Sequence, residues 1–232
     1  MNYELARNYF KKVDESINYK GSGILIGIGI VLMLMFKVSA LLGLIGIALI
    51  ALAIFLIVNR KNSINKEKAS IPTDAQYDSE VSKMLTGLKP KALNALGLDE
   101  DEVKEIEPIS FDGYVYRGAS NAKRGQDGLW RTNKYEYVIL FFSEHEVHCY
   151  TYNFDTTAEK KSDATDVYFY RDIVSVSTAS KTDKVLGQDV DYEYFKLTTA
   201  GGTALEVSLR DAGNAQRSIN AMRALLKAKK QA

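Results

Sequence analysis

The residue types that build most catalytic and metal-binding sites are scarce in this chain. Its 232 residues include one cysteine, two histidines and three prolines. A single cysteine excludes an intramolecular disulfide and agrees with a reducing compartment. The sequence also lacks a P-loop, an H-E-x-x-H motif and a G-x-S-x-G motif. We therefore expect a protein that is not an enzyme and that uses no cofactor.

Net charge is also nearly absent, at +1 for the whole chain. That value hides an asymmetry, because residues 1–69 hold nine basic and four acidic side chains whereas acids outnumber bases in residues 70–232. General nucleic-acid binding needs a basic face that displaces counterions. The mildly acidic second part of the chain therefore argues against a nucleic-acid partner.

Both histidines and the only cysteine fall in the stretch SEHEVHCY at 143–150. Side chains alternate across a strand, so His148 and Cys149 would point in opposite directions, while His145 would lie in a turn. A structural zinc site needs about four ligands, and the chain has no other cysteine or histidine to supply them. The stretch predicts a β-hairpin, without a metal site or a cysteine nucleophile.

Long apolar runs are what the chain does have. Residues 21–58 contain one charge, Lys37. As a single helix this run would extend roughly 57 Å, nearly twice the ~30 Å thickness of the hydrocarbon core of a bilayer. We therefore predict a transmembrane helical hairpin with its turn at 37–39. A signal peptide is excluded by the length of the run, by the missing cleavage site and by the polar residues that precede it.

Basic residues flank the predicted hairpin on both outer sides, whereas its turn holds only Lys37. By the positive-inside rule, both termini should be cytoplasmic at the cytoplasmic (inner) membrane. Small residues could bring helix backbones together. These candidate interface residues are Gly23 and Gly27 in the first helix and Ser39, Gly43 and Gly46 in the second. They predict either packing of the two helices on each other or homo-oligomerisation.

Three shorter segments surround the hairpin. An apolar stripe formed by Leu5, Tyr9, Val13 and Ile17 predicts an amphipathic juxtamembrane helix over 1–20, which would lie on the inner leaflet or pack on the cytoplasmic domain. Residues 59–73 are polar and predict a linker. Residues 74–108 predict a neck of two or three short helices, with Thr73 or Asp74 as the first N-cap.

From Phe111 onward the sequence alternates with a period of two and is rich in Tyr, Phe, Val and Thr. Seven strands are predicted, at 111–117, 130–143, 146–155, 166–171, 173–180, 190–199 and 203–209. A final amphipathic helix follows, capped by Asp211 and with one apolar face formed by Ala215, Ile219, Met222 and Leu226. The predicted class is an α+β membrane protein.

The runs YVILFFSEHEVHCYTYNF and VYFYRDIVSVSTAS, each strand–turn–strand, carry a resemblance to the pleckstrin-homology (PH-like) superfold and its bacterial and GRAM-like relatives. The resemblance covers about 111–230, within a predicted domain of residues 109–232. It implies a seven-stranded β-sandwich or barrel capped by a C-terminal helix. The whole chain also resembles bacterial membrane proteins that join a helical hairpin to such a domain. A fold of this kind does not by itself assign a function.

The loop between the first two predicted strands is basic and contains Arg117, Lys123, Arg124 and Arg131. In PH-like domains that bind phosphoinositides, basic residues of this loop hold the phosphates. The resemblance therefore implies a site for anionic lipid or another phosphorylated ligand, and the alternative is a solvated hairpin loop.

Tyrosines recur in i, i+2 pairs, so that each pair lies on one face of a strand. Such a face either packs on neighbouring strands or, if it stays open, offers a protein interface at Tyr150 and Tyr152. Our leading hypothesis is a non-enzymatic, membrane-anchored module that recruits a protein or forms an oligomeric scaffold. Binding of an anionic ligand by the basic loop is the alternative.

Overall fold

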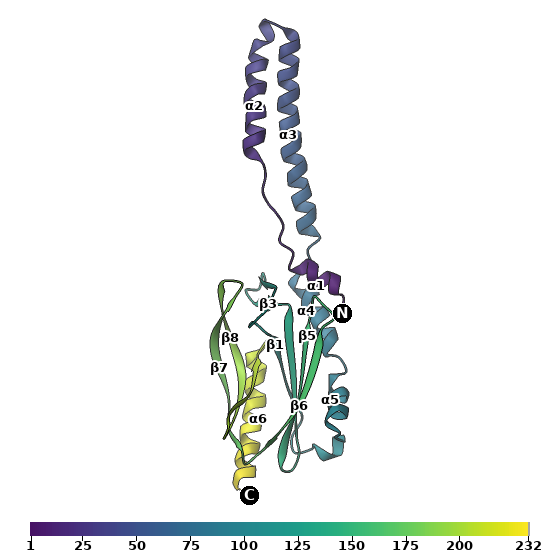
Figure 1. The fold of residues 1–232 in the computed structure, drawn as a ribbon, viewed down its shortest axis with the longest axis vertical. Coiled ribbons are helices and arrows are strands. Elements are labelled where there is room, and N and C mark those ends of the chain that lie inside the picture. The colour runs from purple at the N-terminus through teal and green to yellow at the C-terminus, as the bar shows by residue number, and fades with distance from the viewer. Residues whose placement is uncertain (232) are drawn as a thin grey trace. The chain divides into compact units, whose positions relative to one another are not determined.

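The computed structural model describes residues 1–231, except for the side chains of residues 212 and 214. It is an α+β structure with an N-terminal helical region, antiparallel sheets and a C-terminal helix (Figure 1). The chain forms two compact units, one of residues 11–72 and the other of residues 1–10 together with the chain from Thr73 onward. Each unit is described separately.

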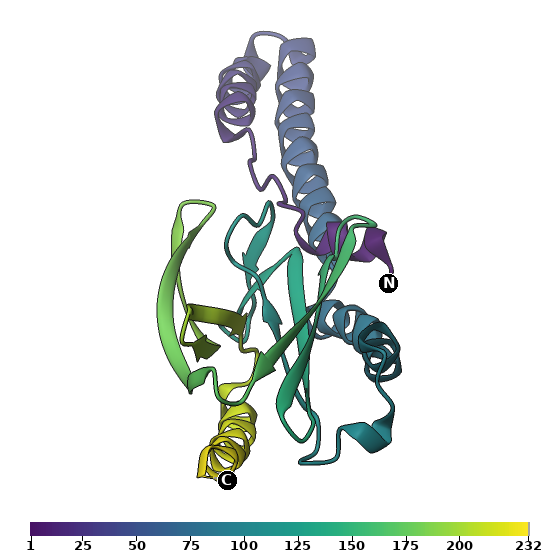
Figure 2. The same cartoon turned by 60° about the horizontal axis from the view of Figure 1, so that its bottom comes forward.

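The unit of residues 11–72 is a helical hairpin. Helix α2 spans Tyr19–Leu34, the short 3-10 helix η1 spans Met35–Lys37, and helix α3 spans Ala40–Ala69. The segment Tyr19–Lys37 and helix α3 are long and apolar enough to cross a membrane. They run side by side in both views (Figures 1 and 2).

The polar stretch at 59–69 is helical, so the prediction of a linker over 59–73 was wrong for most of its length. Helix α3 continues without interruption to Ala69, and Pro72 follows its end. Lys66 and Lys68 lie in the last turn, where cations interact favourably with the helix dipole. Polarity alone does not end a helix when no glycine or proline interrupts it.

The prediction of one amphipathic helix over residues 1–20 was also wrong. Helix α1 spans only Tyr3–Tyr9, and residues 11–18 are not helical. Within this stretch Asp14 accepts a hydrogen bond from the backbone N–H of Ser16 at 3.0 Å, and Asn18 accepts one from Gly21 at 2.8 Å. Such local side-chain bonds compete with the helix, and Val13 and Ile17 therefore do not extend the apolar stripe.

The two helices of the hairpin approach each other through glycine. A Cβ atom at Gly29 would lie 2.8 Å from the carbonyl oxygen of Gly46, and a Cβ at Gly46 would lie 2.5 Å from that of Gly29. Gly43 is packed against the ring of Phe36. By contrast, a Cβ at Gly23 or Gly27 would meet nothing within 4 Å. The helix contact thus uses two predicted glycines and one that was not predicted.

In its described residues, the second unit contains nine strands in three antiparallel groups. The first sheet has the order β1-β4-β5-β6, the second has the order β7-β8-β9, and β2 and β3 form a hairpin. Their bounds are β1 Ile109–Tyr114, β2 Ala122–Arg124, β3 Trp130–Thr132, β4 Lys134–Phe142, β5 Glu146–Asp155, β6 Lys161–Phe169, β7 Ile173–Val185, β8 Gln188–Thr199 and β9 Gly202–Ser208. Both larger sheets are therefore meanders of consecutive strands, apart from the β2–β3 insertion.

The single strand predicted over 130–143 is divided into β3 and β4 at Asn133. The backbone N–H of Asn133 donates to the carbonyl of Asn121 at 3.1 Å, and its side-chain oxygen accepts from the N–H groups of Ser120 and Asn121. These bonds take the chain out of the strand pairing. The short strand β2 completes a hairpin that the sequence pattern did not predict.

One core lies between the two sheets and is closed by helix α6, Ala212–Gln231. Phe111 and Phe195 stack there with ring centroids 4.3 Å apart, and Ile219 and Met222 of α6 are fully buried. The apolar face that was predicted for this helix is the face that it buries.

A second core covers the opposite face of the four-stranded sheet. It is formed by α1, by helix α4 (Asp74–Leu85) and by helix α5 (Leu88–Leu96), which Figure 2 shows on the side of the sheet away from α6. Tyr9 of α1 stacks on Tyr77 of α4 at 4.3 Å. Thr73 caps α4 in a capping box with Gln76. The neck helices therefore dock on the β-sheet.

Candidate functional site

The stretch SEHEVHCY forms the end of β4, a turn and the start of β5. Cys149 is fully buried in the core between the sheets, and burial raises the pKa of its thiol to about 12. His148 points to the other face of β5 and lies 3.3 Å from a carboxylate oxygen of Glu146. Over residues 1–231, no three His, Cys, Asp or Glu side chains are grouped so that they could hold a metal ion. The alternation along the strand separates the histidine from the cysteine, as expected.

Arg131 is a buried structural cation, which contradicts its predicted role in binding a ligand. Only 2 % of the residue is exposed, and its Nη2 lies 2.7 Å from a carboxylate oxygen of Asp78 in α4 and 2.7 Å from one of Asp127. The hydrogen bond from Arg131 lowers the pKa of Asp127 to about 2. Two carboxylates surround one guanidinium, so this cluster has no positive charge left for a phosphate.

The other three predicted residues of the basic loop do not converge either. Lys123 donates from Nζ to the carbonyl of Tyr9 at 3.2 Å and lies 4.1 Å from the centroid of the Tyr9 ring. Arg124 donates from Nε to the carbonyl of Gly128 at 3.0 Å, and Arg117 is exposed. The loop thus mainly joins the β2–β3 hairpin to α1 and α4.

A pocket of about 470 Å³ beside this loop gathers three lysines instead. Lys134 begins β4, while Lys160 and Lys161 lie where the β5–β6 turn runs into β6. In the described part of the chain, no ion pair neutralises any of the three. The one carboxylate of the pocket, Asp155, accepts from Asn133 Nδ2 at 2.7 Å and from the N–H and hydroxyl of Thr157. Sequence analysis missed Lys160 and Lys161. Two adjacent lysines between two predicted strands could have indicated them.

The tyrosine face is covered, so packing is the alternative that describes Tyr150 and Tyr152, and their surface is not open as a candidate interface. Tyr150 is fully buried and Tyr152 is 5 % exposed. Lys91 of α5 places its Nζ 4.6 Å from the Tyr152 ring centroid and 2.9 Å from a carboxylate oxygen of Asp163. Tyr150 donates its hydroxyl proton to the same carboxylate at 3.0 Å. Helix α5 thus occupies the surface that a protein partner would have used.

Strand β6 is exposed, in contrast to the covered tyrosine face. It pairs with β5 on one side only, and within the described residues no strand pairs with its other edge. Eight of its nine residues are exposed, including Val167 at 47 % and Phe169 at 45 %. An unpaired edge of this length presents backbone N–H and C=O groups to any extended segment.

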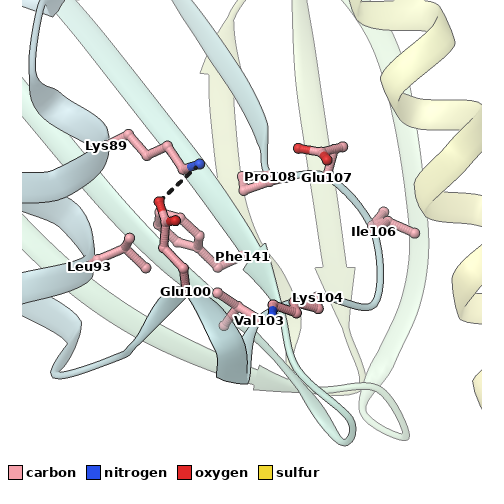
Figure 3. A pocket seen from close by; sticks show the side chains of 9 residues that line it. All are labelled: Lys89, Leu93, Glu100, Val103, Lys104, Ile106, Glu107, Pro108 and Phe141. Atoms are coloured by element: carbon pink, nitrogen blue, oxygen red, sulfur yellow. Dashed lines mark ion pairs between the residues drawn. The ribbon is translucent and has the colours of Figure 1, made fainter.

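A further cavity of about 390 Å³ lies between α5, the segment after it and β4 (Figure 3). Leu93, Val103 and Phe141 line it with apolar side chains, and Lys89 forms an ion pair with Glu100 at 3.4 Å, drawn as the dashed line. Lys104 and Glu107 add one charge of each sign. This balanced lining does not select a ligand of either charge.

No family model, curated protein or solved structure matches this chain.

Proposed function

We propose that this protein is a non-enzymatic, membrane-anchored module with a PH-like cytoplasmic domain, which recruits a protein segment to the inner membrane. Two apolar helices supply the anchor, and the basic flanks of the hairpin favour the cytoplasm for the β domain. The order of a four-stranded meander, a three-stranded meander and a terminal helix supports the PH-like resemblance.

The observation that carries this proposal is the exposed edge of β6. An extended segment can add to such an edge as a further antiparallel or parallel strand, with backbone hydrogen bonds for affinity and side-chain contacts for specificity. Val167 and Phe169 supply apolar contacts along the strand, and Asp166 supplies a charge. The buried tyrosines and the closed face under α5 leave β6 as the better docking element.

The test is affinity capture of the full chain from gently solubilised membranes, followed by mass spectrometry. We expect Val167→Lys to lose the captured partner, because a charge along an edge strand opposes pairing. Leu186→Lys is the matched control, since Leu186 is similarly exposed at 59 % but lies in the β7–β8 turn. Equal capture by both variants would contradict recruitment at β6.

The pocket of Lys134, Lys160 and Lys161 favours a second function, the binding of a phosphorylated ligand. Three unpaired ammonium groups around one pocket attract an anion, and that attraction weakens as salt screens it. Inorganic pyrophosphate titrated into the full chain in detergent should bind, and the double change Lys160→Ala/Lys161→Ala should weaken binding at least tenfold. Lys184→Ala, an exposed lysine on β7, should have no effect. Binding that is insensitive to salt would contradict this function.

A further inference from the structure

The hairpin unit contains a cavity of about 490 Å³ between the segment before α2 and the two helices. Its lining has two parts. Asn18, Ser22 and Arg60 are polar, whereas Leu25, Leu56 and Ile57 are apolar. All of these residues lie within residues 11–72, so the cavity is a property of the hairpin alone.

Arg60 supplies the charge of the polar part. Its Nε donates to the carbonyl of Ser16 at 3.2 Å, and its Nη2 donates to the carbonyl of Asp14 at 2.8 Å. A guanidinium has five N–H groups, so the Nη1 side keeps donors that these bonds do not use. The nearest carboxylate is that of Asp14, at 3.3 Å from Nη2, and its side chain is 74 % exposed. Solvent therefore screens much of this ion pair.

Ser22 is the second polar contribution to the lining of the cavity. The residue is only 8 % exposed and lines the cavity, and its hydroxyl oxygen forms no hydrogen bond within residues 1–231 but is not sealed from solvent. It also lies in the first turn of α2, where free N–H groups and the helix dipole favour an anion. A hydroxyl that faces a cavity and is not used by the protein can donate a hydrogen bond to a bound anion.

The cavity lies at the transition from polar to apolar sequence in both helices. In α2 the apolar run begins after Ser22, and in α3 it ends at Val58, just before Arg60. In a membrane-spanning hairpin this level coincides with the lipid headgroups. A ligand here would thus have one polar and one apolar end.

We propose that this cavity binds a glycerophospholipid, with its phosphodiester between Arg60, Ser22 and the start of α2 and with an acyl chain along Leu25, Leu56 and Ile57. The inference rests on the proposed function in one respect, because it requires the hairpin to lie in a membrane. It does not depend on β6 or on any protein partner.

The experiment measures phospholipid that stays with the full chain after extraction in mild detergent and washing, by native mass spectrometry. We expect the wild type to retain one phospholipid. Arg60→Met should reduce the retained fraction at least fivefold, because methionine keeps much of the apolar stem without the charge. Lys61→Met is the matched control, since Lys61 is the exposed neighbour of Arg60 on the same helix. Ser22→Ala should cause a smaller loss and tests the site without touching an ion pair.

Two further measurements separate the outcomes. Inorganic phosphate added during washing should not displace the lipid, and displacement would show a site for free phosphate and overturn the inference. Resistance of each variant to alkaline carbonate extraction reports membrane insertion independently. If the wild type is extracted, the proposed anchor fails. If it stays inserted but Arg60→Met and the wild type retain equal lipid, only the phospholipid site fails.

Discussion

Glu136 offers a sharp test of how the β domain responds to pH. It lies on β4 opposite Gly113 of β1 and Asn153 of β5, on the strand face that carries Val138 and Leu140 into the core between the sheets. Burial raises the pKa of its carboxyl group from 4.5 to about 7. Among the described residues no group donates a hydrogen bond to this carboxylate, so nothing offsets the cost of burying its charge.

The size and sign of the effect follow from proton linkage. Between pH 4.5 and 7 the folded state holds a proton on Glu136 that the unfolded state has released. The free energy of unfolding therefore falls as pH rises through this window, and this group destabilises the protein above it. The difference between the two pKa values corresponds to at most about 3.4 kcal/mol, at 1.36 kcal/mol for each pKa unit. Glu136→Gln keeps the shape of the side chain and removes the charge.

The assay is urea unfolding of the full chain in detergent, followed by the fluorescence of Trp130, the only tryptophan. At pH 8 we expect Glu136→Gln to raise the free energy of unfolding by about 2–3 kcal/mol, and at pH 4.5 we expect almost no difference from the wild type. Glu193→Gln, on the exposed part of β8, is the control and should change neither value. An unchanged free energy of unfolding at pH 8 would refute the assignment of a half-buried, unpaired charge to Glu136.

Three other changes test the packing. Arg131→Met leaves the carboxylates of Asp78 and Asp127 without their cation. It should lower the free energy of unfolding by about 2–3 kcal/mol in the same urea assay. An effect below about 0.5 kcal/mol would mean that solvent already screens these ion pairs. Gly46→Leu should lower the thermal midpoint of the hairpin in detergent, measured by circular dichroism, because its Cβ would meet the backbone of Gly29. Gly23→Leu is the control and should leave the midpoint unchanged. Similar shifts for both variants would contradict the glycine contact. Tyr9→Leu removes a stacked ring and a hydrogen bond to Asp74, and it should weaken the docking of α1 by about 2 kcal/mol. The amide hydrogens of α1 should therefore exchange faster with solvent. Unchanged exchange would show that α1 does not pack on the sheet.

Patterns within one element could be predicted from sequence. The apolar runs of the hairpin, the face of α6 that contains Ile219 and Met222, and the opposite directions of His148 and Cys149 all follow from the period of a helix or a strand. The capping of α4 by Thr73 is equally local, since the cap and Gln76 are three positions apart. In each case the physical cause lies within a few residues of its effect.

Contacts between distant elements could not be predicted in this way. Arg131 pairs with Asp78, which is 53 positions away on a neck helix. The sequence around Arg131 therefore could not predict that a carboxylate neutralises its charge. Gly23 and Gly27 were the predicted contact residues of α2, yet Gly29 is the glycine that faces the partner helix. The lysine pocket likewise joins Lys134 to Lys160 through the pairing of β4 with β5.

The stacking of Tyr9 on Tyr77 joins two parts of the chain that are separated by the whole hairpin. Helix α1 is synthesised first, but its binding surface on α4 and at Lys123 does not exist until the later residues have been made. If residues 11–72 span a membrane, as we propose, α1 can reach that surface only when both ends of the hairpin emerge on the same side of the bilayer. A chain that crossed the bilayer only once would leave α1 on the opposite side from α4, and Tyr77 would stay uncovered. In the proposed membrane-anchored protein, the docking of seven helical residues would thus make completion of the second core depend on the hairpin crossing the bilayer twice.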